Sequence, residues 1–366
     1  MKVIISIPDF EYVDEKVSLI PWSKAYFINK ALMDQGHDIL LHFSMYQEKS
    51  STITRILKQS QYSKRNKYFN KFSQKIIEKL GFQWSSQELK INIIKYKPDL
   101  ILFIDQSYFS KELLLEIKTI TNAKLIFLLG TSPAATVSRM RIFGSAPYFD
   151  YIFTSDIYHA ISWVELGAAR AECLPISACE PNHHFPPVFN NKEERERFNS
   201  DVSFVGRLNT MFNKKRIDYL LKLCEKFDIA IWSPDIDIIK QHPFLKKYYR
   251  GCANKEDMIK AIGGSKISLN FHSQYVVGGG NMRLFEIPAT KTLQIVDYYN
   301  EEWFIEGEEI VSFDNHSDLE QKIEYYLANP VEREKIAEAG YKKVYQHHTY
   351  KNRVNKIMDK LKKEKY

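Results

Sequence analysis

The sequence predicts an α/β protein built from two successive series of strand and helix units. Short apolar runs rich in β-branched residues alternate with segments whose apolar residues recur at helical spacing, and the alternation occurs twice. Such units build parallel sheets with right-handed crossovers. The chain has 366 residues, of which 44% are apolar and 14% aromatic, and this is enough for two cores of ordinary size. With 14 Gly and 13 Pro, the composition excludes a fibrous or disordered chain.

The first series predicts a parallel sheet in the N-terminal half. Its six predicted strands cover residues 3–7, 38–43, 99–104, 124–129, 151–154 and 172–175. Helices are predicted over residues 23–35 and 111–120, and Gly36 follows the first as a left-handed cap.

The second series predicts a similar sheet in the C-terminal half. Its predicted strands cover residues 202–205, 229–232, 267–271, 293–296 and 309–311, and its helices start at Lys214, Lys255, Asn281 and Ser317. Residues 190–199 are polar and dense in charge, which is typical of a linker. We therefore expect an N-terminal domain over residues 1–185, a linker over 186–200 and a C-terminal domain over 201–366. The last helix, about residues 349–364, is a candidate to cross back to the N-terminal domain.

Location and redox state follow from features that the sequence lacks. No apolar run approaches the length that spans a bilayer, and the first eight residues are too short an apolar stretch for a secretion signal. The expectation is a cytoplasmic protein, with the inner face of the cell membrane as a second location. Cys173, Cys179, Cys224 and Cys252 show no paired spacing, so we expect reduced thiols and no structural metal.

The most distinctive motif is GGGNMRLFEIPA at residues 278–289, between a predicted strand and a predicted helix. Glycine lets the backbone take positive φ and approach a ligand closely. Asn281 is suited to cap the helix, whose free N–H groups then face a phosphate. Glu286 lies a little over one turn inside, where it can accept two hydrogen bonds from a diol such as a ribose. The alternative is a loop of glycines beside a surface glutamate.

Residues before, within and after this motif occur in a recognisable order. They are Leu269, Asn270, Asn281, Arg283, Phe285, Glu286, Pro288, Ala289, Glu309, Ile310, Val311, Phe313, residues 325–330, residues 336–341, His348, Thr349, Tyr350 and Arg353. From Ile267 to Arg353 the chain resembles the C-terminal half of group 1 glycosyltransferases, in the branch called CgeB-like or spore-maturation-protein-like. The resemblance implies a GT-B fold, two Rossmann-like domains that face a central cleft, with the donor nucleotide in the C-terminal domain and the acceptor in the N-terminal one.

The resemblance also implies a donor site. In the family an Arg after a glycine and a Lys a few residues later hold the diphosphate of the donor, and Arg207, after Gly206, and Lys215 are the best matches, with Lys214 as the alternative register. The physical reason is that the phosphate oxygens gain negative charge as the glycosidic bond breaks. A solvated helix start over residues 214–216 is the other interpretation. The full predicted donor set is Gly206, Arg207, Lys215, Gly279, Gly280, Asn281, Arg283 and Glu286, with no metal and no cofactor beyond the nucleotide sugar.

Two positions depart from the family pattern. Gly278 stands where retaining members commonly carry a Glu, so contacts to the donor sugar are expected from Asn281, Arg283 or the backbone N–H groups of residues 279 and 280. The anomeric outcome therefore stays open. Lys291 stands where a glycine is usual, and a positive φ there would cost about 1 kcal/mol.

A catalytic base is expected in the N-terminal domain or near the domain junction. The candidates are Asp9 and Asp105, each after a predicted strand, and His183, beside His184. A carboxylate or imidazole within reach of an acceptor hydroxyl would supply about a hundredfold or more. The alternatives are loop caps for the aspartates and a packed or surface histidine. Residues 130–133 either line the same cleft or cap the following helix.

The net charge of +7 is concentrated in one predicted helix over residues 62–80. Five lysines recur there at three- and four-residue spacing, and aromatic and apolar residues fill much of the rest. The lysines are Lys64, Lys67, Lys71, Lys75 and Lys79. This lysine stripe predicts either contact with an anionic membrane, beside a lipid-linked acceptor, or a solvated face. No nucleic-acid module is recognisable, so no nucleic-acid partner is expected.

Together these features predict a metal-independent glycosyltransferase of polysaccharide or glycoconjugate biosynthesis. It would move a sugar from a nucleotide diphosphate sugar to a hydroxyl of a glycan, a lipid-linked saccharide or a protein. The alternatives are a GT-B sugar-nucleotide epimerase or hydrolase, and a degenerate GT-B protein that binds sugars or assembles with partners.

Overall fold

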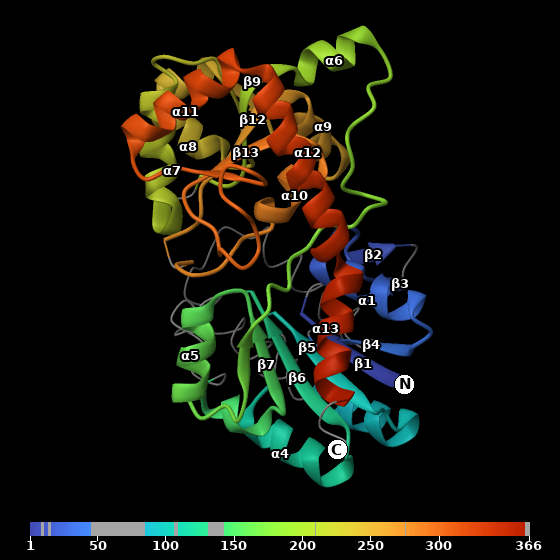
Figure 1. Ribbon diagram of the computed structural model, residues 1–366. Helices are drawn as coiled ribbons and strands as arrows, with labels where there is room; N and C mark the ends of the chain where they lie inside the picture. The colour runs from blue at the N-terminus through green and yellow to red at the C-terminus, as the bar shows by residue number, and fades with distance from the viewer. Residues whose placement is uncertain are drawn as a thin grey trace, which may run out of the picture. The chain divides into compact units, whose positions relative to one another are not determined.

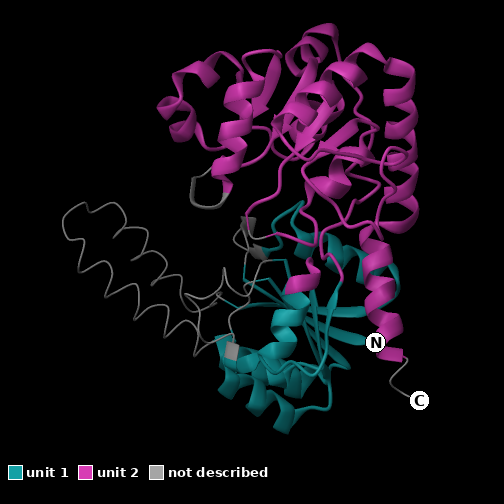
Figure 2. Ribbon diagram, turned by 60° about the vertical axis from the view of Figure 1, so that its left-hand side comes forward, with its two compact units in different colours: residues 1–154, 159–173 teal, residues 155–158, 174–366 magenta. Residues whose placement is uncertain are grey.

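The computed structural model contains two six-stranded parallel sheets, each in its own compact unit (Figures 1 and 2). It describes residues 1–8, 11–13, 16–44, 85–105, 109–130, 143–208, 210–274 and 276–362. Unit 1 comprises Met1–Thr154 and His159–Cys173, and unit 2 comprises Ser155–Tyr158 and Leu174–Tyr366. The predicted α/β class with two parallel sheets is confirmed.

The sheet of unit 1 has the strand order β4-β1-β5-β6-β7-β8. Its strands are β1 (Lys2–Ile7), β4 (Asp38–Phe43), β5 (Leu100–Ile104), β6 (Lys124–Leu129), β7 (Tyr151–Thr154) and β8 (Ala171–Cys173). All six predicted strands are present, with bounds shifted by at most two residues. The short antiparallel pair β2 (Glu11–Val13) and β3 (Lys16–Ser18) was not predicted, because three-residue strands carry no readable periodicity.

Among the helices whose bounds the structure describes, unit 1 contains the two predicted ones and two further ones. They are α1 (Lys24–Asp34), α4 (Lys111–Ile120), the 3-10 helix η3 (Phe143–Tyr148) and α5 (Ile157–Glu165), whose first two residues group with unit 2. Ser23 caps α1 by accepting from Tyr26 N–H at 3.1 Å, and Gly36 after it has φ 77°. The predicted left-handed cap at Gly36 is therefore confirmed. Between the sheet and its helices lies an aromatic core in which Phe127 stacks on Phe149 and meets the buried Trp163 edge-on.

The sheet of unit 2 has the order β11-β10-β9-β12-β13-β14. Its strands are β9 (Ser200–Val205), β10 (Ile229–Trp232), β11 (Tyr249–Gly251), β12 (Ser265–Asn270), β13 (Leu293–Val296) and β14 (Val311–Ser312). The strand β11 has no apolar run and was not predicted. β14 starts two residues later than predicted, because Glu309 lies in the preceding turn and Ile310 forms only an isolated bridge with Glu306.

Nine helices are described in unit 2. They are α6 (Lys192–Phe198), α7 (Thr210–Leu223), α8 (Ile236–Gln241), the 3-10 helix η4 (Pro243–Lys247), α9 (Glu256–Gly263), α10 (Arg283–Ala289), α11 (His316–Ala328), α12 (Pro330–His347) and α13 (Tyr350–Lys362). The helix α7 bends at Asn213, so the start predicted at Lys214 coincides with its regular part.

The segment predicted as a linker contains the helix α6. Asn191 caps it by accepting from Glu194 N–H at 2.7 Å, and the buried Phe198 stacks on Trp232 with ring centroids 5.2 Å apart. This end of the predicted linker is thus folded onto unit 2. In α13, the apolar residues Val354, Ile357 and Leu361 are buried at helical spacing. The predicted domain boundaries, and the predicted crossing of this last helix, remain predictions.

The carboxyl ends of β9, β12 and β13 lie side by side at one edge of the sheet of unit 2. In open α/β sheets ligands collect at this edge. The segments that leave it are the loop after Val205, the loop from Phe271 to the start of α10, and the turn that begins at Asp297. The lysine stripe and Asp9 lie outside the described residues. Within the part of the chain that is described, no helix is both long and apolar enough to cross a membrane.

Candidate functional site

The start of α10 is fixed by a chain of buried amides. Asn281 Oδ1 accepts from Leu284 N–H at 3.0 Å, so the predicted capping role of Asn281 is confirmed although regular helix begins only at Arg283. Its Nδ2 donates to Asn270 Oδ1 at 2.7 Å, and Asn270 Nδ2 donates to Gln294 Oε1 at 3.0 Å. The turn is therefore anchored to both β12 and β13, the two strands beneath it.

A proline inside α10 extends this network. Pro288 has no N–H to give to Leu284 C=O, which would otherwise be the partner one turn earlier. Gln294 Nε2 donates to that carbonyl at 3.4 Å instead. Because a buried carbonyl without a partner is costly, Gln294 supports the helix at the point where its own ladder is interrupted.

The glycine triplet is required for close packing rather than for backbone conformation. Among the described glycines, positive φ occurs at Gly36, Gly167, Gly251 and Gly307, so the expectation of positive φ at residues 278–280 is wrong. A Cβ on Gly279 would lie 1.9 Å from Ser155 O, and one on Gly278 would lie 2.7 Å from a methyl carbon of Ile157. Only glycine lets the backbone approach this closely.

The segment against which the triplet packs carries a buried carboxylate, Asp156. Its side chain is fully buried, and Oδ2 accepts from Val277 N–H at 2.7 Å and from Gly278 N–H at 2.8 Å. Gly280 N–H donates to Ser155 O at 3.2 Å. The turn is thus held by protein groups. Backbone N–H groups of Gly279 and Gly280 were predicted to contact the donor sugar, and that of Gly280 is already bonded to Ser155 O. Sequence reasoning missed Asp156, because its partner lies more than a hundred residues away.

Glu286 is buried at the inner side of α10, with 1% of its surface exposed. One of its oxygens, Oε2, accepts from Arg283 Nη1, one turn earlier on the same helix. Arg283 Nε also donates to Val205 O at 2.9 Å, which ties the helix to the end of β9 beside Gly206. From the sequence, Glu286 was expected to accept two hydrogen bonds from a diol. The structure shows that one of its two oxygens already accepts from Arg283.

The other oxygen of Glu286 faces His184. The distance from His184 Nε2 to Glu286 Oε1 is 3.7 Å, and both side chains are almost fully buried. His184 Nδ1 accepts from Glu180 N–H at 2.8 Å, so the proton of the neutral ring lies on Nε2. Burial lowers the pKa of His184, although the charge of Glu286 opposes this shift. The structure therefore places His184 beside Glu286, and the role of His183 as a candidate base stays a prediction.

The predicted phosphate-binding cations lie at the same edge and are accessible. The Arg207 side chain is 69% exposed, with Nη1 3.8 Å from Asp235 Oδ1. Lys215 is about half exposed, and its Nζ lies 3.7 Å from Asp297 Oδ2. Arg216 has a structural task, because its Nε donates to Phe271 O at 2.9 Å and its Nη1 to Arg207 O at 2.8 Å. The loop after β9 is thereby fixed while Arg207 and Lys215 point outward.

Asp297, the residue after β13, is buried beside His272, which follows β12. His272 donates its backbone N–H to both oxygens of Asp297 at 3.1 Å, and Nδ1 lies 2.7 Å from Oδ1. Burial opposes ionisation of Asp297, but the hydrogen bonds from His272 and the charge of Lys215 hold its pKa below the usual range. Neither residue was singled out from the sequence.

In unit 1, Asp105 follows β5 and is engaged by neighbours within that unit. Lys24 Nζ lies 2.8 Å from Asp105 Oδ2, and Gly130 N–H donates to Oδ1 at 3.3 Å. Its φ of 49° lies in the left-handed region, where Asp is tolerated better than most residues. The geometry fits the alternative of a loop cap. Asp9 and residues 131–133 lie outside the described residues, so the catalytic base remains a prediction.

Lys291 adopts the left-handed backbone that its position suggested. Its φ is 58°, its Nζ lies 2.7 Å from Glu338 Oε2, and Nζ lies 4.7 Å from the centre of the Tyr341 ring. These contacts offset part of the cost of about 1 kcal/mol expected for a side chain there.

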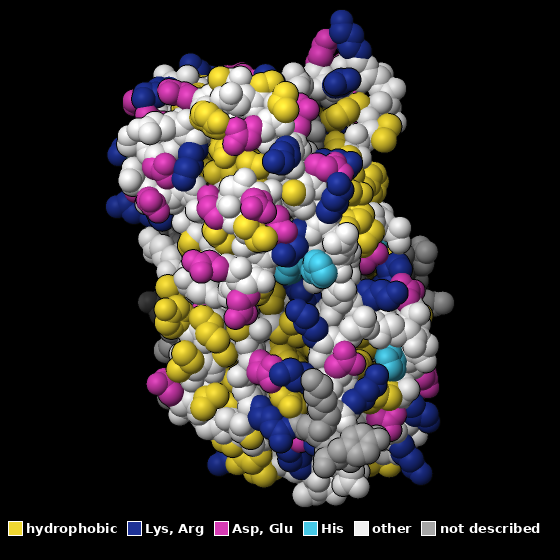
Figure 3. All heavy atoms as spheres, in the orientation of Figure 1, with side chains coloured by type: hydrophobic (Ala, Val, Ile, Leu, Met, Phe, Trp, Pro, Cys, Tyr) yellow, Lys and Arg dark blue, Asp and Glu magenta, His cyan; other side chains and the backbone are white. Residues whose placement is uncertain are grey.

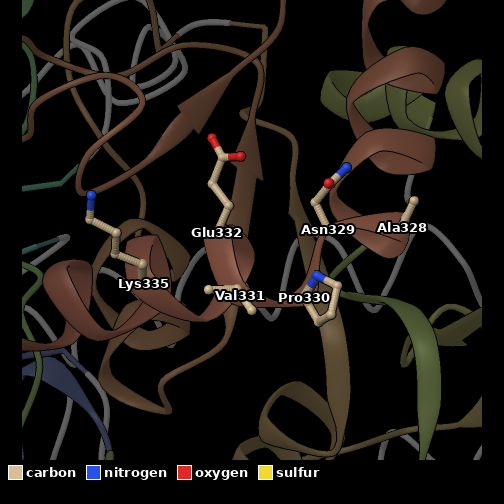
Figure 4. A pocket seen from close by; sticks show the side chains of 6 residues that line it. All are labelled: Ala328, Asn329, Pro330, Val331, Glu332 and Lys335. Atoms are coloured by element: carbon tan, nitrogen blue, oxygen red, sulfur yellow. The ribbon is translucent and has the colours of Figure 1, made fainter.

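A surface hollow lies elsewhere in unit 2, and Figure 4 shows the side chains that line it. It is formed by the turn between α11 and α12, and its lining residues are Ala328, Asn329, Pro330, Val331, Glu332 and Lys335. Because α11 starts soon after β14 and runs back along the sheet, its end lies towards the amino ends of the strands. The hollow is therefore separate from the site described above.

Comparisons with known proteins agree with this architecture. Residues 214–359 match the family model described as glycosyl transferase-like. Among solved structures, HepE of Anabaena in complex with UDP-glucose is similar with a TM-score of 0.65 at 12% identity, covering 99% of this chain and 100% of that one. Sucrose-phosphate synthase of Thermosynechococcus elongatus has a TM-score of 0.67 at 12% identity, with 99% and 98% covered. A glycosyltransferase of Rickettsia africae has a TM-score of 0.61 at 14% identity, with the same coverage. No curated protein sequence matched the chain.

These comparisons define the fold and the nature of one domain. The two parallel sheets have the GT-B arrangement of strands and helices, and residues 214–359 form a glycosyltransferase-like domain. That domain contains α7 with Lys215, the glycine turn, and α10 with Glu286.

Proposed function

We propose that this protein is a glycosyltransferase that uses a nucleotide diphosphate sugar as donor and transfers the sugar to a hydroxyl group. The observation that carries the proposal is the buried Glu286 at the carboxyl edge of a parallel sheet, within a glycosyltransferase-like domain. A buried carboxylate with one oxygen bonded to Arg283, and the other 3.7 Å from His184, keeps capacity to accept from a ligand.

In this proposal, different residues of unit 2 contact the ribose and the diphosphate of the donor. Glu286 accepts from the ribose hydroxyl groups, and Arg283 and His184 hold it in place. Arg207 and Lys215 contact the diphosphate, whose oxygens gain negative charge when the bond from the sugar C1 to the phosphate oxygen breaks. The helix α10 has only seven residues, and Asn281 already occupies one of its free N–H groups, so the side-chain cations carry most of the positive field.

Metal-independent chemistry is part of this proposal. The two cations would supply the charge that a divalent ion supplies elsewhere. The base that activates the acceptor is proposed among Asp9, Asp105 and His183, each of which can accept a proton from a hydroxyl group.

The acceptor is proposed to be a glycan, a lipid-linked saccharide or a protein, in polysaccharide or glycoconjugate biosynthesis. The assignment to the CgeB-like branch rests on the ordered residues between Asn270 and Arg353. UDP-glucose is the first donor to test, because a structure of similar fold was determined with it.

Membrane contact is proposed for the lysine stripe alone. On the face of unit 2 seen in Figure 3, side chains of both charges are interspersed and give no single-sign surface. Replacing Lys67, Lys71 and Lys75 with glutamine should lower binding to acidic liposomes by about 3 kcal/mol, with a strong salt dependence. Failure of the parent protein to sediment with acidic liposomes at low salt would contradict the membrane proposal.

A nucleotide panel and product analysis test the activity. We expect thermal stabilisation by one class of nucleoside diphosphate, since a ligand at a hundred times its Kd adds about 2.7 kcal/mol. Transfer requires an acceptor, whereas an epimerase or hydrolase changes the sugar nucleotide without one, and a degenerate protein binds without turnover. Absence of stabilisation by every nucleoside diphosphate and sugar nucleotide would contradict the proposed function.

A further inference from the structure

We infer that His272 is a further ligand-contacting residue of the donor site, whose Nε2–H donates a hydrogen bond to the diphosphate of the donor. This inference rests on the proposed function. The side chain of His272 is 1% exposed, and among the described residues Nε2 has no hydrogen-bond partner. A buried polar atom without a partner is costly, and a common reason for one in a native protein is a ligand that completes it.

The pairing with Asp297 sets the state of the imidazole ring. An ionised carboxylate only accepts hydrogen bonds, so the 2.7 Å contact to Asp297 Oδ1 fixes the proton of Nδ1. Nε2 is then the ring nitrogen left for a ligand, and the inference is that it holds a proton while the diphosphate is bound. A phosphate oxygen, which is negatively charged and accepts hydrogen bonds, is the ligand group that matches such a donor.

The position of the pair relates His272 to the predicted phosphate-binding lysine. Asp297 contacts both groups, with Oδ1 2.7 Å from His272 Nδ1 and Oδ2 3.7 Å from Lys215 Nζ. His272 and Asp297 follow the adjacent strands β12 and β13, so both lie at the edge where ligands collect. One buried carboxylate thus holds His272 and Lys215 at the same part of this edge.

Tyr298 links this pair to the loop before the glycine turn. Its ring centroid lies 4.2 Å from that of His272, and its hydroxyl group donates to Val276 O. Val277, next along the loop, is exposed and donates its N–H to Asp156. Among the residues that the structure describes, the charged and titratable groups around His272 are Asp297, Lys215, Tyr298 and, through the loop, Asp156. Because the side chain of His272 is 1% exposed and the Tyr298 ring lies against it, the inference requires this ring to move aside when the ligand binds.

Two substitutions of His272 separate ligand contact from a structural role. The amide nitrogen of Gln reproduces the position of Nε2, and that of Asn reproduces the position of Nδ1. We expect His272→Asn, which keeps the bond to Asp297, to weaken nucleoside diphosphate binding tenfold or more and to leave binding of the nucleoside unchanged. His272→Gln should retain most of the affinity for the diphosphate. Calorimetry with UDP and uridine, or with the pair that the nucleotide panel identifies, measures both.

The outcomes distinguish this inference from the function on which it depends. If the parent protein binds no nucleoside diphosphate, the proposed function fails. If the parent binds the diphosphate more tightly than the nucleoside and His272→Asn binds both like the parent, only the role of His272 is overturned. Loss of affinity for the nucleoside and the diphosphate alike in His272→Asn would show a structural role and would also overturn it. Asp237→Asn, an exposed change on α8, is the matched control and should leave both affinities unchanged.

Discussion

The carboxyl edges of the two sheets differ in how their charged residues are used. At the edge of unit 2, buried groups from several loops converge: Glu286 with Arg283 and His184, and His272 with Asp297. At the edge of unit 1, the described carboxylate of Asp105 is occupied by Lys24 and by Gly130 N–H. The first edge keeps polar capacity that no described protein group uses, and the second satisfies its carboxylate internally. A polar residue at the end of a strand is therefore a candidate binding residue only when one of its donor or acceptor atoms is not already hydrogen-bonded within the protein.

The largest expected effect comes from Glu286, at the centre of the edge of unit 2. Glu286→Ala leaves Arg283 with an unpaired charge in a largely buried place, and we expect the free energy of unfolding to fall by about 3 kcal/mol or more. Glu286→Gln keeps the size and one hydrogen bond, so it should fold, but it should lose about 1.5 to 3 kcal/mol of nucleoside diphosphate affinity.

Urea unfolding and calorimetry measure these two effects, and the exposed Glu308→Gln serves as the control. Unchanged affinity in Glu286→Gln would contradict the ribose-binding role and would remove the main distinction between the two edges.

Acid should destabilise both units, because each contains a histidine buried in its neutral form. Burial lowers the pKa of His42, in unit 1, to about 4, and burial together with the charge of Arg353 lowers that of His348, in unit 2, to about 2. An unfolded histidine binds a proton near pH 6.5. Below that pH the unfolded state therefore binds more protons than the folded state, and stability falls as pH decreases towards the folded pKa.

We expect each of these histidines to lower the free energy of unfolding by about 2 kcal/mol between pH 7 and pH 5. Urea titrations at the two pH values measure the loss. His42→Asn should reduce the pH dependence of the transition of unit 1 and leave that of unit 2 unchanged. A transition midpoint for unit 1 that is equal at pH 7 and pH 5 in the parent would show that this assignment is wrong.

The two lysines at the start of α7 test the register of the phosphate site. Lys215→Ala should lower turnover about tenfold and should affect nucleoside affinity little, because its target is the phosphate on which charge develops. Lys214→Ala is the matched control on the next residue, and we expect it to behave like the parent. If Lys214→Ala loses turnover and Lys215→Ala does not, the register is shifted by one residue.

Substitution of Asp105 tests whether the edge of unit 1 has only a structural role. Asn tolerates the left-handed backbone at this position, so Asp105→Asn removes the charge without straining the turn. We expect a loss of about 1 kcal/mol in the free energy of unfolding, from the weakened pairing with Lys24, and unchanged nucleotide affinity. A transfer rate reduced about a hundredfold, with the fold intact, would instead identify Asp105 as the catalytic base and make the edge of unit 1 functional.

The smallest expected effect compares two lysines with positive φ, one in each unit. Lys97 has φ 51° and is exposed, with no ion pair to any described residue, so Lys97→Gly should raise the free energy of unfolding by about 0.5 to 1 kcal/mol. Lys291→Gly should change it by less, because the substitution also removes the contacts with Glu338 and Tyr341. Thermal unfolding of both variants checks the order, and equal gains would show that those contacts contribute nothing.

The sequence by itself determined the two parallel sheets, most strand bounds and the capping role of Asn281. These features depend on residues close together in the chain. A buried strand needs a continuous apolar run, and Asn281 caps a helix that begins two residues later, at Arg283. The ordered residues from Leu269 onwards also led to the resemblance to glycosyltransferases, and a glycosyl transferase-like family model matches residues 214–359. The sequence failed where an element was too short to show a period, as in β2, β3 and β11.

Only the tertiary structure decided which polar groups meet. The contacts of Asp156 with Gly278, of His184 with Glu286 and of His272 with Asp297 join residues that are 25 to 122 positions apart, so no local spacing could reveal them. It also gave a different reason for the glycine triplet, which packs against the chain at Ser155 with ordinary φ. Propensity and periodicity act over a few residues, whereas the pairing of buried charges is decided by which strand ends lie side by side in the folded sheet.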